Sequence, residues 1–260
     1  MIAPSGAGQR CFAVAAERGA RRILLEDLPG LRQLQDDLDR AAAAHPDCRF
    51  LRRYRAPLNV VARQEAEWAL ADQFLIRGHF AAATRRRAGI DAARLVPWLP
   101  PTDGARATDH AGRGTDDADR ATGHAGCGAW RRRRRILLAG LAAARHGTAE
   151  ALALLRARDS IELVVRAGEG FEPLELASHP RAILHPAGPA GERDLLRGVD
   201  LVIAPSWCEA YPPELARAAR RGLPIIATGR AAGFLEPYAV EPGDGAGLVA
   251  TVDRLLAPIP

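Results

Sequence analysis

The sequence predicts an α/β protein whose carboxy-terminal half is a Rossmann-like parallel sheet and whose amino-terminal half is a smaller, partial α/β unit. From residue 136 onward, short apolar runs rich in branched residues alternate with helical patterns. This alternation is typical of buried parallel strands joined by crossover helices. Residues 102–130 hold Gly, Ala, Thr, Asp and Arg with almost no large apolar side chain, so they separate the two halves.

The expected organisation therefore has three parts. Residues 1–100 form the partial amino-terminal domain, residues 101–134 form a flexible linker, and residues 135–260 form the Rossmann-like domain. A chain of 260 residues is long enough for one large domain or two small ones.

The elements of the first half follow from apolar periodicity. The strongest helical pattern places Leu58, Val61 and Trp68 on one face. The opening segment Gly6-Ala7-Gly8 follows no predicted strand, so the half is expected to lack a strand followed by a Gly-rich loop. The predicted elements are a strand at 22–26, helices at 31–44 and 58–71, a strand at 74–77, a helix through 85 and a strand at 95–98.

The second half alternates more regularly. Its predicted elements are strands at 136–139, 161–165, 182–184, 201–204 and 225–228, and helices at 149–156, 192–197, 212–221 and 246–256. Parallel pairing follows from this alternation.

Residues 199–230 form the βαβ unit around which we expect the site to lie. Pro212 and Pro213 suit the first helical positions, and Glu214 suits the positive end of the helix dipole. Gly222 suits the left-handed residue that ends the helix. The loop before this helix, residues 206–211, emerges at the carboxyl edge of the sheet, where such folds bind ligands.

This segment also carries a family resemblance. D-L-V-I-A-P-S-x-x-E at 200–209, followed by R-G-L-P-I-I-A-T at 221–228, resembles the donor-binding segment of GT-B glycosyltransferases, especially those of family 4. R-Q-E-A-E-W-A-L-A-D at 63–72 resembles the end of their amino-terminal domain. The resemblance implies a GT-B-like fold, here with a shortened amino-terminal domain that is either a natural short form or one whose beginning is missing.

The resemblance assigns roles to residues of the segment. The family has two glutamates separated by seven residues, the first near the donor sugar and the second near the ribose; here these positions are Glu209 and Arg217. Glu209 would accept sugar hydroxyls and orient the donor, or else simply cap the helix. Arg217 would supply positive charge at the ribose position, or else pair with Glu214. The backbone N–H groups of Ala210, Tyr211 and Glu214 would face the diphosphate, whereas the two prolines have none.

The loop at 140–147 is the second candidate, because backbone amides and a cation after a strand can hold a diphosphate. The family pattern has an Arg after the first Gly and a Lys before the second; here, after Gly140, these positions are Leu141 and His146. Arg145 would substitute from the neighbouring position, or the loop is purely structural. Residues 167–170 form a third loop, which the resemblance assigns to the nucleotide-base pocket. Two glycines in a turn are equally typical of an ordinary connection between a strand and a helix.

Composition bounds the partners. The formal net charge is +5, and all the basic residues counted in it are Arg because the sequence has no Lys. A charge of this size does not require a nucleic acid as partner. The Arg run at 131–135 is read as a solvated linker end, with contact to an anionic membrane surface as the alternative. His110, His124 and Cys127 fit no zinc spacing, and Cys208 has no His near it in sequence, so neither a metal site nor a thiol nucleophile is expected.

Together these features predict a hexosyltransferase that uses a nucleotide-sugar donor and a carbohydrate or lipid acceptor. The resemblance implies retention of configuration and no bound metal or other cofactor. The four cysteines show no disulfide pattern, and no signal peptide or membrane span is seen, so a cytoplasmic, bacterial-like protein at or near the inner membrane face is expected. The alternative is a catalytically inactive glycosyltransferase-like protein that binds a nucleotide, a glycan or a partner enzyme.

Overall fold

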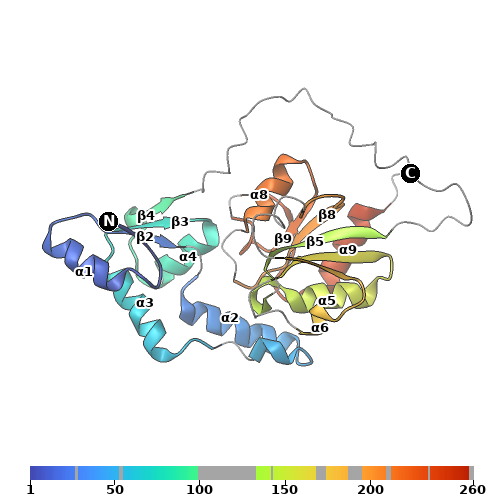
Figure 1. Ribbon diagram of the computed structural model, residues 1–260, viewed down its shortest axis with the longest axis horizontal. Helices are drawn as coiled ribbons and strands as arrows, with labels where there is room; N and C mark the ends of the chain where they lie inside the picture. The colour runs from blue at the N-terminus through green and yellow to red at the C-terminus, as the bar shows by residue number, and fades with distance from the viewer. Residues whose placement is uncertain are drawn as a thin grey trace, which may run out of the picture.

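The computed structural model describes residues 1–26, 29–52, 55–98, 133–141, 143–167, 174–186, 195–208, 212–233 and 235–257. Two parallel sheets, each with its own helices, form two α/β halves that lie side by side (Figure 1). Within these residues, no helix is long and apolar enough to cross a membrane. Residues 101–132 of the predicted linker, including the first two arginines of the run at 131–135, fall outside the described residues.

The first sheet has four parallel strands in the order β1-β2-β3-β4. Its apolar core is built around Phe12, Leu24, Trp68 and Phe74. The strands are β1 (Ile2–Pro4), β2 (Ile23–Glu26), β3 (Gln73–Ile76) and β4 (Leu95–Pro97), and the helices of this half are α1 (Gln9–Glu17), α2 (Leu31–Ala44), η1 (Arg49–Arg52), α3 (Leu58–Leu70), α4 (His79–Arg87) and η2 (Ala92–Arg94).

The opening of the chain corrects one expectation, because Gly6-Ala7-Gly8 does follow a strand. β1 pairs with β2 in parallel, and the glycine turn leads into α1. The buried carboxylate of Glu67, on α3, accepts hydrogen bonds from the backbone N–H groups of Gly6 at 2.6 Å, Gly8 at 2.9 Å and Gln9 at 3.2 Å. These bonds satisfy donors that the start of a helix leaves unpaired. The prediction was wrong here because a strand of three residues ending in Pro gives no periodic signal.

The second sheet has six parallel strands in the order β10-β9-β8-β5-β6-β7. Counted along the chain from β5, this is the 3-2-1-4-5-6 order of a doubly wound Rossmann fold. The strands are β5 (Arg134–Leu141), β6 (Ile161–Arg166), β7 (Ala182–His185), β8 (Leu201–Ala204), β9 (Ile225–Ala227) and β10 (Tyr238–Ala239), and the helices are η4 (Ala144–His146), α5 (Thr148–Ala157), α6 (Leu174–Ala177), α8 (Pro213–Arg220) and α9 (Gly245–Leu256).

Alternate residues of the central strand β5 point to two separate cores. Ile136 and Leu138 join the cluster that includes residues of α5 and α9, whereas Leu137 and Ala139 join the cluster that includes residues of α8. All four residues are at most 1% exposed. This pattern explains why the sequence of β5 reads as a continuous apolar run: a parallel strand covered by helices on both faces has no polar side.

The helix α2 belongs by sequence to the first half, yet its apolar face lies in the core of the second. Leu34, Leu38 and Ala41 belong to the same buried cluster as Ile136 of β5. The beginning of α2 contacts α3 instead, because the Leu31 backbone N–H donates to Gln64 at 2.7 Å. The helix therefore connects the two halves.

Element types in the described regions largely follow the sequence prediction. The predicted helix at 31–44 and the helix predicted near 246–256 are confirmed, the latter beginning one residue earlier. The first part of the helix predicted at 192–197 lies outside the described residues, and residues 195–198 form a turn. The short elements α6 and β10, like β1 and α1, were not predicted.

We predict that Leu38→Ala lowers the free energy of unfolding by about 2–5 kcal/mol, because the 1% exposed Leu38 side chain fills the core between α2 and the second sheet. Urea denaturation measures the change. Leu58→Ala is the matched control, since Leu58 is also helical but 78% exposed, and a change within about 0.5 kcal/mol is expected. Equal effects of the two substitutions would contradict the burial of α2 in this core.

Candidate functional site

The carboxyl ends of β5 and β8 form the switch point of the second sheet. These strands are parallel neighbours, with Leu138 of β5 opposite Ile203 of β8. The chain continues from β5 toward β6 and from β8 toward β9, in opposite directions across the sheet. Doubly wound folds bind ligands in the crevice that this divergence leaves. The two loops singled out from the sequence, at 140–147 and 206–211, begin here (Figure 1).

Glycine is required at two positions of the loop after β5. Gly140 has φ +86° and Gly147 has φ +81°, a region that favours glycine. A Cβ added at Gly147 would lie 2.4 Å from the carbonyl oxygen of Pro205, in the loop after β8. The close approach of the two loops therefore depends on this glycine.

Hydrogen bonds fix three loops to one another at this edge. The Arg145 carbonyl oxygen accepts from the Ser206 hydroxyl at 2.8 Å and from the Trp207 backbone N–H at 3.0 Å. From the loop after β9, the Thr228 hydroxyl donates to the Ser206 carbonyl oxygen at 2.7 Å. The loops after β5, β8 and β9 consequently form one connected scaffold.

His146 and Arg145, predicted as diphosphate ligands, contact each other. The Arg145 Nε donates to His146 Nε2 at 3.0 Å, and the His146 side chain is buried. A Cβ added at Gly140 would lie 2.9 Å from His146 Nδ1, so the ring packs directly against that glycine. Arg145 is half-buried, whereas His146 is 2% exposed.

Glu214 lies in the first turn of α8, as predicted, and is 1% exposed. Its Oε2 accepts from the Gly140 backbone N–H at 3.4 Å, and its Oε1 lies 3.1 Å from Arg166 Nη2. Arg166 was not predicted, although its place at the end of a predicted strand could have indicated it. Arg217, which the sequence offered as a partner for Glu214, is half-buried one turn further along α8.

The remaining predicted donor ligands, Glu209, Ala210 and Tyr211, lie outside the described residues, as do residues 168–170 of the base-pocket loop. His110, His124 and Cys127 also lie outside them. Among the described residues, no group of three or more His, Cys, Asp or Glu side chains is arranged to hold a metal ion. Cys208 is fully buried beside the loop after β5.

A cluster of polar side chains contacts Trp207, in the loop after β8. Trp207 Nε1 donates to Glu150 Oε1 at 2.6 Å, and His45 Nε2, at the end of α2, lies 3.1 Å from the same oxygen. The hydrogen bond to Glu150 raises the pKa of His45 above its ordinary value of 6.5, against the opposing effect of partial burial. The cluster links α2, α5 and the loop that precedes Glu209.

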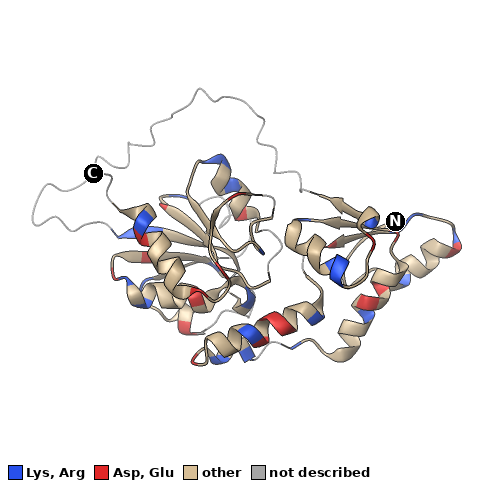
Figure 2. Ribbon diagram, turned by 180° about the vertical axis from the view of Figure 1, so that it is seen from behind, with Lys and Arg blue, Asp and Glu red and all other residues tan. Residues whose placement is uncertain are grey.

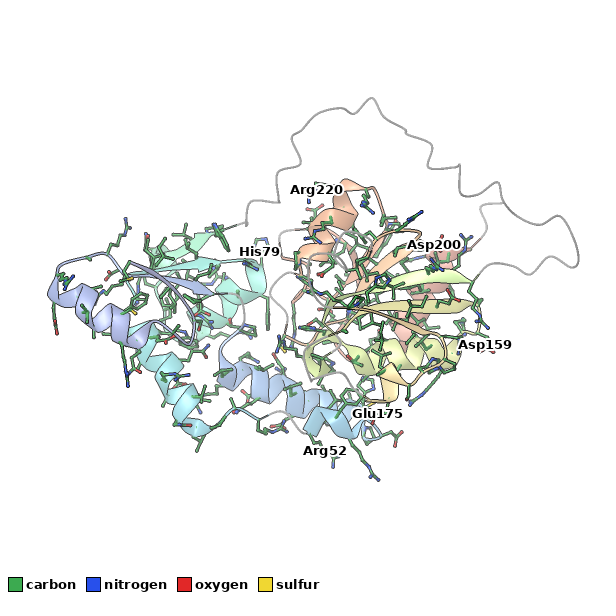
Figure 3. The ribbon with its side chains drawn as sticks, in the orientation of Figure 1. Arg52, His79, Asp159, Glu175, Asp200 and Arg220 are labelled. Carbon is green, nitrogen blue, oxygen red and sulfur yellow. The ribbon has the colours of Figure 1, made fainter. Side chains whose placement is uncertain are left out.

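Arg230, in the loop after β9, contacts both halves. Its Nη1 donates to the Trp207 carbonyl oxygen at 2.5 Å and lies 2.6 Å from the buried Asp37 carboxylate of α2. Its guanidinium also lies 5.1 Å from the ring centroid of Phe80, on α4. The neighbouring His79 backbone N–H donates to Gly233 at 3.4 Å, and Figure 3 shows His79 on the side of the first half that faces the second.

No protein-family model matches the chain, and no curated protein matches it in sequence. Solved structures match its fold. Sucrose-phosphate synthase from Thermosynechococcus elongatus superposes with a TM-score of 0.62 at 14% identity, over 98% of this chain and 64% of that one. The Anabaena protein HepE in complex with UDP-glucose gives 0.57 at 13% identity, over 96% and 67%. The apo lipopolysaccharide galactosyltransferase WaaB gives 0.53 at 14% identity, over 95% and 69%.

These structures are GT-B glycosyltransferases, and the chain has their fold: two α/β halves with parallel sheets, of which the second is Rossmann-like. The predicted fold class is confirmed. The chain spans about two thirds of the length of these three proteins.

The raised pKa of His45 predicts a pH-dependent contribution to stability. The contribution is fully present below pH 6.5 and is lost as the pH rises through the raised value, because His45 then loses the charge that pairs with Glu150. His45→Ala should therefore lower the free energy of unfolding more at pH 6 than at pH 9. Denaturant titrations at several pH values measure the difference.

His179→Ala is the control with the opposite sign. Partial burial, together with Arg181 and Arg156, lowers the pKa of His179, so its contribution should be lost as the pH falls. Parallel pH profiles for the two variants would contradict the assignment of charge to the His45–Glu150 pair.

Proposed function

We propose that this protein is a glycosyltransferase that transfers a hexose from a nucleotide-sugar donor to a carbohydrate or lipid acceptor. The observation that carries the proposal is the switch point of the second sheet, where two hydrogen-bonded loops meet in a chain with the GT-B fold. Ligands of doubly wound sheets bind in this crevice. HepE, which has the same fold, forms a complex with UDP-glucose, and this supports a nucleotide-sugar as the donor.

Within the proposal, the donor lies along the loops after β5 and β8. Gly140, Arg145 and His146 line the diphosphate side, while Glu209 orients the hexose and Arg217 supplies charge near the ribose. The backbone N–H groups of Ala210, Tyr211 and Glu214 face the phosphates. Positive charge at these loops would stabilise the leaving nucleoside diphosphate as its negative charge develops.

The finer assignments belong to the same proposal. We assign the chain to the family 4 type, with retention of configuration and no bound metal or cofactor, on the motif resemblance at 200–209 and 221–228. A cytoplasmic location at the inner membrane face would bring the enzyme to a lipid acceptor.

The charged side chains that the structure describes indicate how strongly the Arg run could bind an anionic membrane. Arg134 and Arg135 of the Arg run lie in β5 and pair with Asp200 and Glu162, respectively. Figure 2 shows Arg, Asp and Glu interspersed over the ribbon of both halves. Such mixed charge favours the solvated interpretation of the run over strong electrostatic binding to an anionic surface.

Calorimetric titration of the full chain with UDP, GDP and their hexose conjugates tests the donor site. One conjugate should bind saturably, and Glu209→Ala should weaken it by about 1–3 kcal/mol, since unpaired sugar hydroxyls lose hydrogen bonds to a charged group. Glu236→Ala, outside the two loops of the site, should leave the affinity unchanged. Absence of binding in a protein whose fold is verified by circular dichroism would contradict the proposal and favour the inactive alternative.

A further inference from the structure

An ion pair bridges the switch point of the second sheet. Glu214 comes from α8, which follows β8, and Arg166 comes from the end of β6. These strands flank β5 on opposite sides, and the two side chains meet above its last residues. The pair therefore spans the crevice in which doubly wound folds bind ligands.

The environment of the pair is that of a buried anion site. The Glu214 side chain is 1% exposed and that of Arg166 is 14% exposed. Glu214 Oε2 accepts a hydrogen bond from the backbone N–H of Gly140 at 3.4 Å. Glu214 Oε1 lies 3.1 Å from Arg166 Nη2 but forms no hydrogen bond to any described group. A guanidinium and a glycine N–H beside a helix start are the groups that proteins use to bind phosphate oxygens.

Stability alone gives a weak reason for this arrangement. Removing two charges from water costs several kcal/mol per ion, and the attraction between them offsets this only when the geometry is excellent and the remaining lone pairs are satisfied. Glu214 Oε1 lacks a hydrogen bond to the described groups, so the carboxylate is incompletely satisfied. An external anion with more acceptor oxygens would satisfy the same donors better.

The two positions where the resembled family pattern has cations, 141 and 146, are less suited to the role. The position after Gly140 is Leu141, and His146 is buried and accepts a hydrogen bond from Arg145. The start of α8 contributes few donors, because Pro212 and Pro213 have no N–H. Among the described residues, Arg166 is thus the cation that shares a carboxylate with Gly140.

We propose that the Glu214 carboxylate is a placeholder for the donor diphosphate: in the unliganded site it occupies the position of a phosphate group. Arg166 and the Gly140 N–H, which now contact this carboxylate, would then bind the diphosphate of the donor. Binding of a nucleoside diphosphate displaces the carboxylate and takes over Arg166. This inference rests on the proposed function and adds Arg166 to the donor-binding residues. Without a bound donor, the Glu214 carboxylate offsets the charge of Arg166.

Three variants of the full chain test the displacement, with UDP and inorganic pyrophosphate as probes. Glu214→Gln removes the competing charge, so both probes should bind at least about tenfold more tightly than to the wild type, the equivalent of one charged hydrogen bond. Arg166→Gln should weaken binding by a similar factor. Glu162→Gln is the matched control, because Glu162 pairs with Arg135 near the start of the same strand, β6, and should leave affinity unchanged.

The rise in Tm on addition of pyrophosphate supplies a readout that a purely structural ion pair would not change. Glu214→Gln removes the carboxylate charge beside a largely buried Arg166, so Tm should fall without ligand and rise more with pyrophosphate than in the wild type. If Glu214→Gln does not fold, Glu214→Asp withdraws the carboxylate by one methylene group and should tighten binding in the same direction.

The outcomes separate this inference from the proposed function. If the wild type binds the probes and both Glu214→Gln and Glu214→Asp weaken this binding or leave it unchanged, the placeholder role of Glu214 is wrong. The donor site of the proposed function would still stand. Binding that appears only when Glu214 is replaced would support the placeholder and count against donor binding by the unmodified chain. Absence of binding in all folded variants would overturn both.

Discussion

The structure of the second half depends on the burial of β5 on both faces. Residues 136–139 are at most 1% exposed, and their side chains alternate between two helix-covered cores. A central strand covered in this way must have neighbours on both edges, and parallel neighbours require crossover connections. The connections from β5 to β6 and from β8 to β9 run in opposite directions across the sheet, and this divergence creates the crevice at the carboxyl ends of β5 and β8.

The loops at that crevice are held by hydrogen bonds whose acceptors are main-chain carbonyl oxygens and whose donors include the Ser206 and Thr228 hydroxyls. The Arg145 carbonyl oxygen joins the loop after β5 to Ser206 and Trp207, and Thr228 joins the loop after β9 to the same segment. These bonds depend on the two hydroxyls and on the path of the main chain, and they use no side chain at positions 141 and 146. The scaffold is therefore compatible with Leu141 and His146 at the two positions where the pattern of the resembled family has cations. Among the described residues, the helix α2 connects the two halves, because its apolar face packs in the second core while its first turn is bonded to α3 in the first half.

Arg230 reinforces this connection, because it contacts Asp37 of α2, Phe80 of α4 and the Trp207 carbonyl oxygen. Any displacement of one sheet relative to the other must alter the contacts of the loop after β8. The geometry between the halves and the geometry of the site are therefore interdependent.

Local sequence determined the strands and helices whose signal lies within a few residues. The apolar run of β8, the proline start of α8 and the glycine after it predicted the βαβ unit and the sheet edge that carries the candidate site, and α2 was clear from its 3.6-residue period. Tertiary structure decided what depends on residues far apart in the chain. β1 has only three residues and exists because β2 pairs with it, and the periodicity of α2 shows that one face is buried but not which core receives it. The contact of Arg166 with Glu214 likewise arises because the strand order places them on opposite sides of β5. The sequence by itself thus determined the kind of fold and the edge that carries the candidate site, whereas the charge balance of the site follows from long-range packing, because an ion pair depends on distance in space.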